Sequence, residues 1–257
     1  MSLLLEALRW LGEADHWSGE GGVTARLLQH LAVSALVVGI AAAVALPLGV
    51  LVGHTGRGRG LVVVTASAAR AVPTLGLLTL VALASGIGLT APVLALVVLA
   101  APPLLAGAYA GVESVDRVTV DAARAVGMSE AQVVRRVELP LAAPLVVGGL
   151  RSATLQVVAT ATLAAYTADV GLGRLLFAGL KARRYDEMLA AALLVAALAL
   201  VLELLLAGLQ RLVSPAGVRT AGARRRTVTG TTVARGKPGE PPAPKHDVTA
   251  PPVERTP

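Results

Sequence analysis

Long apolar runs place the strongest constraint on what this chain can form. Residues 27–52 contain no charged side chain, and at about 1.5 Å per helical residue this run exceeds the ~30 Å hydrocarbon core of a bilayer. Four further apolar runs follow, at residues 61–83, 92–112, 141–167 and 187–212. Only 15% of the residues are charged, whereas a soluble domain carries about 25%. The sequence therefore predicts an all-α membrane protein with five transmembrane helices.

The two ends of the chain differ from these runs. Leucines among residues 3–11 share one side of a short helix, and about ten residues cannot span a bilayer. Residues 1–22 are therefore predicted to be an interfacial helix and loop. Residues 214–257 are basic, rich in proline and without apolar periodicity, which predicts a disordered tail. Its run Arg224-Arg225-Arg226 either contacts anionic membrane lipid or is simply solvated.

The distribution of arginines predicts an orientation. The loop at residues 54–60, the charged segment at 115–139 and the tail all contain arginines, and basic loops stay on the cytoplasmic side. Five spans then leave the N-terminus outside and the C-terminus in the cytoplasm. The connector at residues 168–186 does not fit this orientation, because it places four basic side chains on the outer side of the membrane. The other three segments fit it.

The charged segment at residues 115–139 is predicted to be a helical hairpin. Its first helix has an apolar face made of Val115, Val118, Ala122, Ala125 and Val126. Gly127 stands where a left-handed cap ends a helix. Ser129 and Gln132 have the spacing of a capping box for the second helix, which Pro140 is expected to end.

Three interpretations of this hairpin compete. A DNA-binding helix-turn-helix needs its own core, but membrane-length runs flank this one. The net charge of +7 does not indicate nucleic acid either, since the tail holds eight Lys/Arg against three Asp/Glu. The remaining interpretations are a solvated cytoplasmic loop and a docking site for a partner protein.

The hairpin resembles a motif of the membrane subunits of ABC importers. Those subunits carry a cytoplasmic loop with Glu-Ala-Ala, three residues, Gly, nine residues, Ile, one residue and Leu-Pro. The same spacing is filled here by Asp121, Ala122, Ala123, Gly127, Val137, Leu139 and Pro140. Asp121 stands in place of the usual Glu, and Val137 in place of Ile.

Other stretches resemble permeases of osmoprotectant importers, which carry glycine betaine, carnitine and choline. These stretches are residues 70–75, 86–88, 111–116, 135–141, 151–154 and 171–173. With the hairpin, the resemblance covers residues 25–213. It implies the five-helix core of a type I ABC importer permease (MetI-like) that works by alternating access. An amino-acid or methionine permease and a non-transporting membrane scaffold are the alternatives.

The resemblance also implies partners. They are a second permease subunit, an extracytoplasmic solute-binding protein, and a cytoplasmic ATPase dimer that contacts Ala122, Ala123, Gly127 and Met128. The chain lacks the phosphate-binding pattern G-x-x-x-x-G-K-[ST], so ATP is expected on the ATPase, and no cofactor, metal or catalytic residue is assigned here. Aromatic cages hold quaternary ammonium groups. Only 2% of the residues are aromatic, so high-affinity recognition is expected in the binding protein.

Three charged residues lie deep within predicted spans: Arg70, Arg151 and Glu203. All three are about 14 Å from the cytoplasmic end of their spans, at ~1.5 Å per residue. Charges in membranes rarely face lipid and usually pair. Glu203 is therefore predicted to pair with Arg70, Arg151 or both; the alternative is that one of them reaches the membrane surface.

Several uncharged residues are candidates for the transport pathway. Ser152, Gln156 and Thr160 repeat every four residues, so they either line a pathway or form hydrogen bonds between helices. Tyr109 and Tyr166 either offer cation–π contacts to a passing solute or pack in the interior. The turn at residues 171–173 is predicted to form an external gate or to contact the binding protein.

Overall fold

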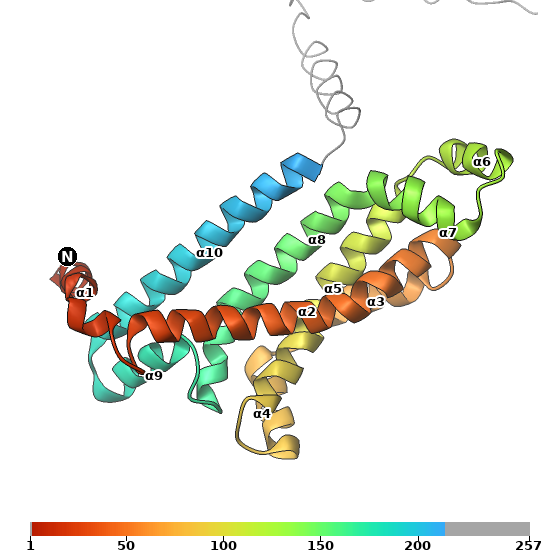
Figure 1. Ribbon diagram of the computed structural model, residues 1–257. Helices are drawn as coiled ribbons and strands as arrows, with labels where there is room; N and C mark the ends of the chain where they lie inside the picture. Colours follow the sequence, from red (N-terminus) through yellow and green to blue (C-terminus); the bar gives the residue numbers. More distant parts are fainter. Residues whose placement is uncertain (1, 214–257) are drawn as a thin grey trace, which may run out of the picture. The chain divides into compact units, whose positions relative to one another are not determined.

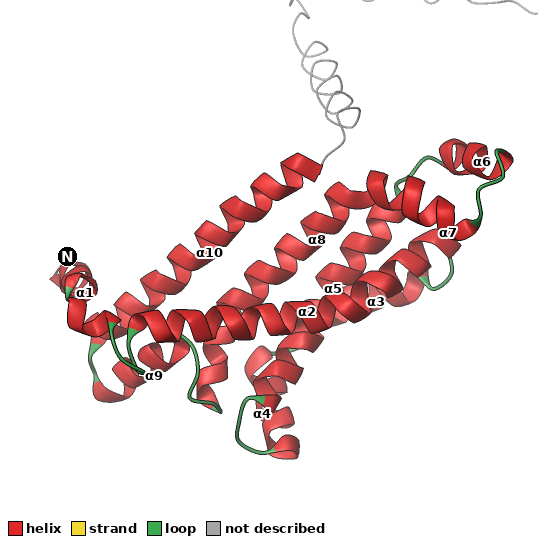
Figure 2. Ribbon diagram, viewed as in Figure 1, coloured by secondary structure: helices red, strands yellow, loops and turns green. Residues whose placement is uncertain are grey.

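Four long apolar helices dominate the chain. The computed structural model describes residues 2–213, except for the side chains of Ser2, Leu61, Ala66 and residues 68–70; the predicted tail lies outside this range. The long helices are α2 (Val23–Thr55), α5 (Thr90–Glu113), α8 (Leu139–Thr160) and α10 (Tyr185–Val213) (Figure 1). By length and composition α2, α5, α10 and the segment Glu130–Tyr166, which contains α8, are able to cross a membrane. Figure 2 shows only helices and loops in the described range, so the predicted all-α membrane fold is confirmed.

The segment predicted as the second span is not one helix. It forms α3 (Arg59–Ala71) and α4 (Thr74–Ser85), separated at Val72 and Pro73. Proline lacks a backbone N–H and disfavours helical backbone angles in the residue before it. Val72 accordingly has φ −79° and ψ 120°, which is extended. At 13 and 12 residues, each half is about 20 Å long or less, so the prediction of a continuous span here was wrong.

Small residues let α2, α5 and α8 approach one another closely. A Cβ on Gly107 of α5 would lie 2.7 Å from the Cα of Gly149 on α8. A Cβ on Gly49 of α2 would lie 2.7 Å from the carbonyl oxygen of Leu105 on α5. Van der Waals contact of this kind holds helices together in lipid, where there is little hydrophobic driving force. These three helices form the packed centre of the described residues.

Shorter helices lie at the ends of the long ones. The predicted N-terminal helix is α1 (Ser2–Gly12), which contacts α10 and is followed by the 3₁₀ turn η1 (Ala14–Trp17). A second 3₁₀ turn, η3 (Ala161–Tyr166), extends α8. The connector after it contains a helix that the sequence analysis did not predict, α9 (Gly173–Ala182).

Candidate functional site

The predicted hairpin lies between α5 and α8 and consists of α6 (Arg117–Ala125) and α7 (Glu130–Val133) (Figure 1). Helix α6 begins two residues later than predicted, because the side chain of Asp116 accepts a hydrogen bond of 3.0 Å from the backbone N–H of Val118 and caps it. Gly127 has φ +86°, the predicted left-handed conformation. The backbone N–H of Met128 donates to Ala123 O and that of Gly127 to Arg124 O, which completes a Schellman motif.

The second helix starts as predicted but does not end as predicted. The backbone N–H of Ser129 donates to Gln132 Oε1 at 2.8 Å, as in a capping box. Beyond α7 the chain makes one π-helical turn, η2 (Val134–Glu138), and continues directly into α8. The prediction that Pro140 ends the helix was therefore wrong. The wider π turn just before Pro140 accommodates a residue that has no N–H to donate.

The hairpin has a small core of its own. Val115, Val120, Ala123 and Val133 are buried, with Met128 and Val137 packed against them. Ala123 and Met128, which the resemblance assigned to the ATPase contact, therefore point at least partly inward. Ala122 and Gly127 are exposed.

Most of the predicted apolar face of α6 points away from this core. We call its exposed members, Val118, Ala122, Ala125 and Val126, the apolar stripe. Val118 is 73% exposed and Val126 is 79% exposed. Only Val115 of the predicted face turns inward. No other part of the described chain covers the stripe, which distinguishes it from a face that packs back on its own protein.

An ionic cluster joins the two helices of the hairpin. Arg124 donates from Nε and Nη2 to the two carboxylate oxygens of Glu130 at 2.9 and 3.0 Å, and from Nη1 to Asp121 Oδ1 at 3.2 Å. The hydrogen bonds with Glu130 raise the pKa of Arg124 above its ordinary value. The Asp121 carboxylate of the motif thus has a partner within its own helix.

His54, which the sequence analysis did not single out, connects the hairpin to α2. Its Nδ1 lies 2.8 Å from Glu138 Oε2, and its Nε2 lies 3.1 Å from Glu130 Oε2. Glu138 is only 2% exposed. The last turn of α2 is thereby tied to both α7 and η2.

A second ionic cluster lies between α8 and α10. Arg151 donates from Nε to Glu203 Oε2 at 2.7 Å and from Nη2 to Glu203 Oε1. Its Nη1 donates to Gln210 Oε1 at 3.1 Å, and Gln210 Nε2 donates to Pro144 O at 2.9 Å. The structure thus brings together Arg151 and Glu203, with Gln210 as an unpredicted third member. The side chain of Arg70 lies outside the described part of the chain.

The pathway candidates do not share one environment. Ser152 is exposed, whereas Gln156 Nε2 donates to Leu99 O on α5 at 3.3 Å and so links two helices. Thr160 donates to Gln156 O within its own helix. Tyr109 is buried, and Tyr166 is largely exposed with its ring 6.3 Å from that of Phe177.

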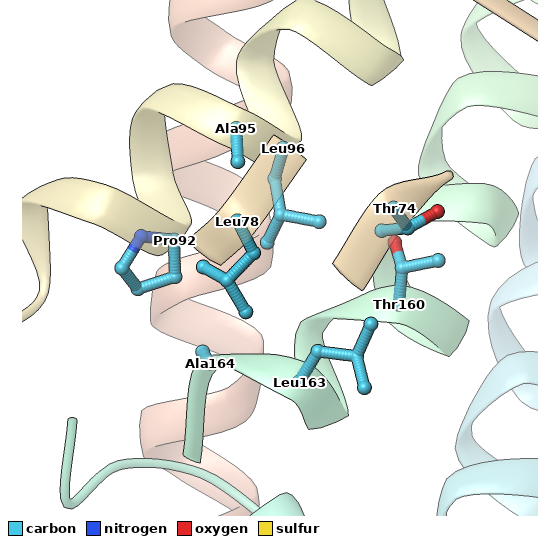
Figure 3. Close-up of a pocket in the computed structure, with 8 residues that line it drawn as sticks. All are labelled: Thr74, Leu78, Pro92, Ala95, Leu96, Thr160, Leu163 and Ala164. Carbon is cyan, nitrogen blue, oxygen red and sulfur yellow. The ribbon is translucent and has the colours of Figure 1, made fainter. Parts of the chain in front are cut away.

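Thr160 also borders a void between α4, α5 and the end of α8 (Figure 3). The other lining residues are Thr74, Leu78, Pro92, Ala95, Leu96, Leu163 and Ala164. At about 10 Å³ the void has room for a single water at most and cannot hold an organic solute.

The opposite end of α2 contacts the turn at residues 171–173. Arg26 Nη2 lies 3.0 Å from Asp169 Oδ1, and Arg174 Nε lies 3.0 Å from the same oxygen. The backbone N–H of Gly171 donates to Gln29 Oε1 at 3.1 Å. Two carboxylates thus offset part of the positive charge of the connector, since Arg184 also pairs with Glu187 at 2.8 Å. Among the described residues, no group of His, Cys, Asp and Glu has the arrangement of a metal site.

Comparisons with known proteins match this architecture. Residues 45–217 match the family described as "Binding-protein-dependent transport system inner membrane component". The choline transport system permease protein OpuBB of Bacillus subtilis is 31% identical over 77% of this chain and 92% of its own. The carnitine transport permease protein OpuCB of Listeria monocytogenes is 34% identical over 75% of this chain and 88% of its own. The osmoprotectant import permease protein OsmW of Salmonella typhimurium is 31% identical over 77% of this chain and 95% of its own.

Solved structures share the fold at lower identity. An inward-facing structure of the MetNI methionine ABC transporter has a TM-score of 0.65 at 21% identity, over 75% of this chain and 96% of the matched chain. An amino acid ABC transporter crystallised with histidines has a TM-score of 0.60 at 19% identity, over 81% of this chain and 97% of the matched chain. Together with the family match and the curated relatives, these similarities show that the chain belongs to the inner membrane components of binding-protein-dependent transport systems.

Proposed function

We propose that this chain is the permease subunit of an ATP-driven importer for quaternary-amine osmoprotectants such as glycine betaine, choline and carnitine. Three relatives at 30% to 34% identity are named for choline, for carnitine, and for glycine betaine, carnitine and choline together. The methionine and amino-acid transporters resemble the chain at only 21% and 19% identity, which supports the fold but not their substrates.

The apolar stripe is the observation that carries the ATP-driven part of this proposal. A partner with a complementary apolar cleft covers Val118, Ala122, Ala125 and Val126, which the chain itself leaves exposed. That partner is a cytoplasmic ATPase, which binds ATP in place of this chain. The contacts of His54 with Glu130 and Glu138 then carry movements of the hairpin to α2 and to the start of α8. Alternating access of the pathway follows from this connection.

The proposal has further parts. A second permease subunit completes the pathway, and an extracytoplasmic binding protein delivers the solute. The hairpin and the C-terminus lie in the cytoplasm of a multi-pass protein in the cell membrane, and the N-terminus lies outside. The turn at residues 171–173, on the end of α2 away from the hairpin, then faces the binding protein.

Uptake by the reconstituted complex tests the proposal. Proteoliposomes that contain the permease, its ATPase and its binding protein are expected to accumulate at least one of the three solutes when ATP is present. Uptake of amino acids alone would favour the amino-acid permease, and an absence of ATP-dependent uptake of any solute would favour a scaffold.

A matched pair of variants tests the role of the stripe. Val118→Asp places a charge on the stripe at the second residue of α6, where the helix dipole favours an acid. It is expected to abolish ATPase binding without unfolding the hairpin. Arg117→Asp introduces the same side chain one residue earlier, outside the stripe, and is expected to retain binding. Equal loss in both variants would contradict the assignment.

A further inference from the structure

We propose that the pocket around Arg151 and Glu203 is a low-affinity binding site for a zwitterionic quaternary-ammonium solute on its way through the membrane. This inference rests on the proposed function and adds a site within this chain to it. The pocket lies between α8 and α10 and is lined by Gly148, Arg151, Ser152, Leu155, Glu203 and Gln210.

The pair lies in the membrane part of the chain without being fully covered. Arg151 and Glu203 belong to two of the helices able to cross a membrane, yet their side chains are 34% and 27% exposed. Charged groups at such positions rarely face lipid and instead face protein or a water-filled cavity. The exposed side of this pair is therefore expected to face water in the assembled transporter.

The pocket is an open depression with enough room for a small solute. Its volume of about 340 Å³ is within the range of small-molecule sites, which runs from roughly 300 to 1,000 Å³. The absence of a side chain on Gly148 contributes to this space, since a Cβ there would lie 3.2 Å from Gln210 Nε2. Ser152, which is exposed, adds a hydroxyl-bearing side chain to the lining.

The charges of the pocket complement a zwitterion. Arg151 has five N–H donors, of which the structure uses one each from Nε, Nη1 and Nη2. Its remaining donors can bind a solute carboxylate, while the carboxylate of Glu203 attracts the trimethylammonium group. Gln210 holds the guanidinium in place through its own bond to Pro144 O. Glycine betaine and carnitine carry both charges, whereas choline carries only the positive one.

A binding site within the transport pathway is expected to hold its solute weakly. The solute competes with the contact that Arg151 and Glu203 already make with each other. None of the described residues that line the pocket is aromatic. A site on a transport pathway must attract its solute but also release it. High-affinity selection remains with the binding protein.

The ratio of choline uptake to glycine betaine uptake in the reconstituted complex tests this inference. Arg151→Gln leaves the negative charge of Glu203 alone and is expected to raise the ratio by roughly fivefold or more, whereas Glu203→Gln leaves a positive charge and is expected to lower it by a similar factor. As a matched control, Arg59→Gln and Glu113→Gln remove the charges of a pair outside the pocket, and both are expected to leave the ratio unchanged.

Opposite shifts separate solute binding from a structural role. If the pair only held α8 and α10 together, both pocket variants would slow the uptake of both solutes equally, and an unchanged ratio would overturn the inference. A wild-type complex that carries neither solute would instead contradict the proposed function itself.

A second measurement keeps the native pair intact in case these variants do not fold. The chain has no cysteine, so Ser152→Cys provides a single thiol in the lining of the pocket. Glycine betaine is expected to slow its reaction with a water-soluble maleimide more than sucrose of equal osmolality does. Equal rates with both additives, or a thiol that does not react at all because another subunit covers it, would overturn the inference.

Discussion

Two clusters of acid–base pairs use the same kinds of side chain in different surroundings. In the hairpin, Arg124 binds Asp121 and Glu130 near the surface, and His54 extends the cluster to the buried Glu138. Between α8 and α10, Arg151 and Glu203 pair inside helices able to cross a membrane. Water screens the first cluster and can replace lost partners. The second cluster lies at membrane depth, where a charge without its partner is costly even if one side of the pair faces water.

The largest effect on stability is therefore expected at Glu203. Glu203→Gln leaves the guanidinium of Arg151 without its counter-ion at membrane depth and is expected to lower the thermal midpoint of the purified permease by roughly 8 °C. The double variant Arg151→Gln/Glu203→Gln removes both charges and is expected to recover part of the loss. A double variant no more stable than the single one would show that the pair does not tie α8 to α10.

A smaller loss is expected at His54. His54→Ala removes a partner of the Glu138 carboxylate, which is 2% exposed, and an unsatisfied buried acceptor costs about 1–3 kcal/mol. The same change separates the hairpin from α2, so uptake per ATP hydrolysed is expected to fall more than ATPase binding does. His54→Gln keeps one hydrogen bond and serves as the milder control; equal coupling in all three proteins would contradict this role.

Substitutions at Gly127, in the turn between the two helices of the hairpin, are expected to lower stability only slightly. Their effect on transport is expected to grow with the size of the new side chain. A Cβ at position 127 would have open space around it. Gly127→Ala is nevertheless expected to lower the free energy of unfolding by about 1 kcal/mol, because a residue with a side chain is strained at φ +86°. Gly127→Asn tolerates this conformation better and should be the more stable of the two. Gly127→Arg is expected to abolish transport through its bulk while the protein still reaches the membrane; normal solute-stimulated ATPase activity in that variant would contradict a close approach of the partner.

The smallest effect is expected at Arg124. Its partners Asp121 and Glu130 are more than half exposed, and surface pairs contribute little. Arg124→Ala is expected to lower the thermal midpoint by about 1 °C, and the difference should vanish at high salt. A shift as large as that of Glu203→Gln would remove the contrast between the two clusters.

The features that the sequence predicted are those with local causes. Apolar runs predicted the four long helices, and a glycine at the end of a helical pattern predicted the left-handed turn at Gly127. The spacing of Asp121, Gly127 and Pro140 identified the hairpin. Equal depths predicted that Glu203 would have an arginine within reach, but did not decide between Arg70 and Arg151.

The features that the sequence did not predict depend on contacts between distant segments or on the local response to proline. His54 and Glu138 are 84 positions apart, and no periodic pattern links them. Pro73 separates two helices, whereas Pro140 follows a π turn and lies within a continuous helical segment. A proline has the same covalent constraint in both places, so its neighbours decide the outcome. The apolar pattern of α6 correctly grouped Val118 with Val126, but it does not distinguish a face that packs inward from a face that a partner covers.

The separation of α3 from α4 has a consequence for how the protein exists in a bilayer. Backbone groups released at a helix end need new hydrogen-bond partners, and hydrocarbon offers none. Val72 is 38% exposed, so this chain does not bury the break by itself. Irregular backbone at membrane depth persists only beside water or beside other protein. A single copy in lipid would therefore leave backbone groups at the break without hydrogen-bond partners. The break marks a side of the chain that needs water or another protein subunit against it.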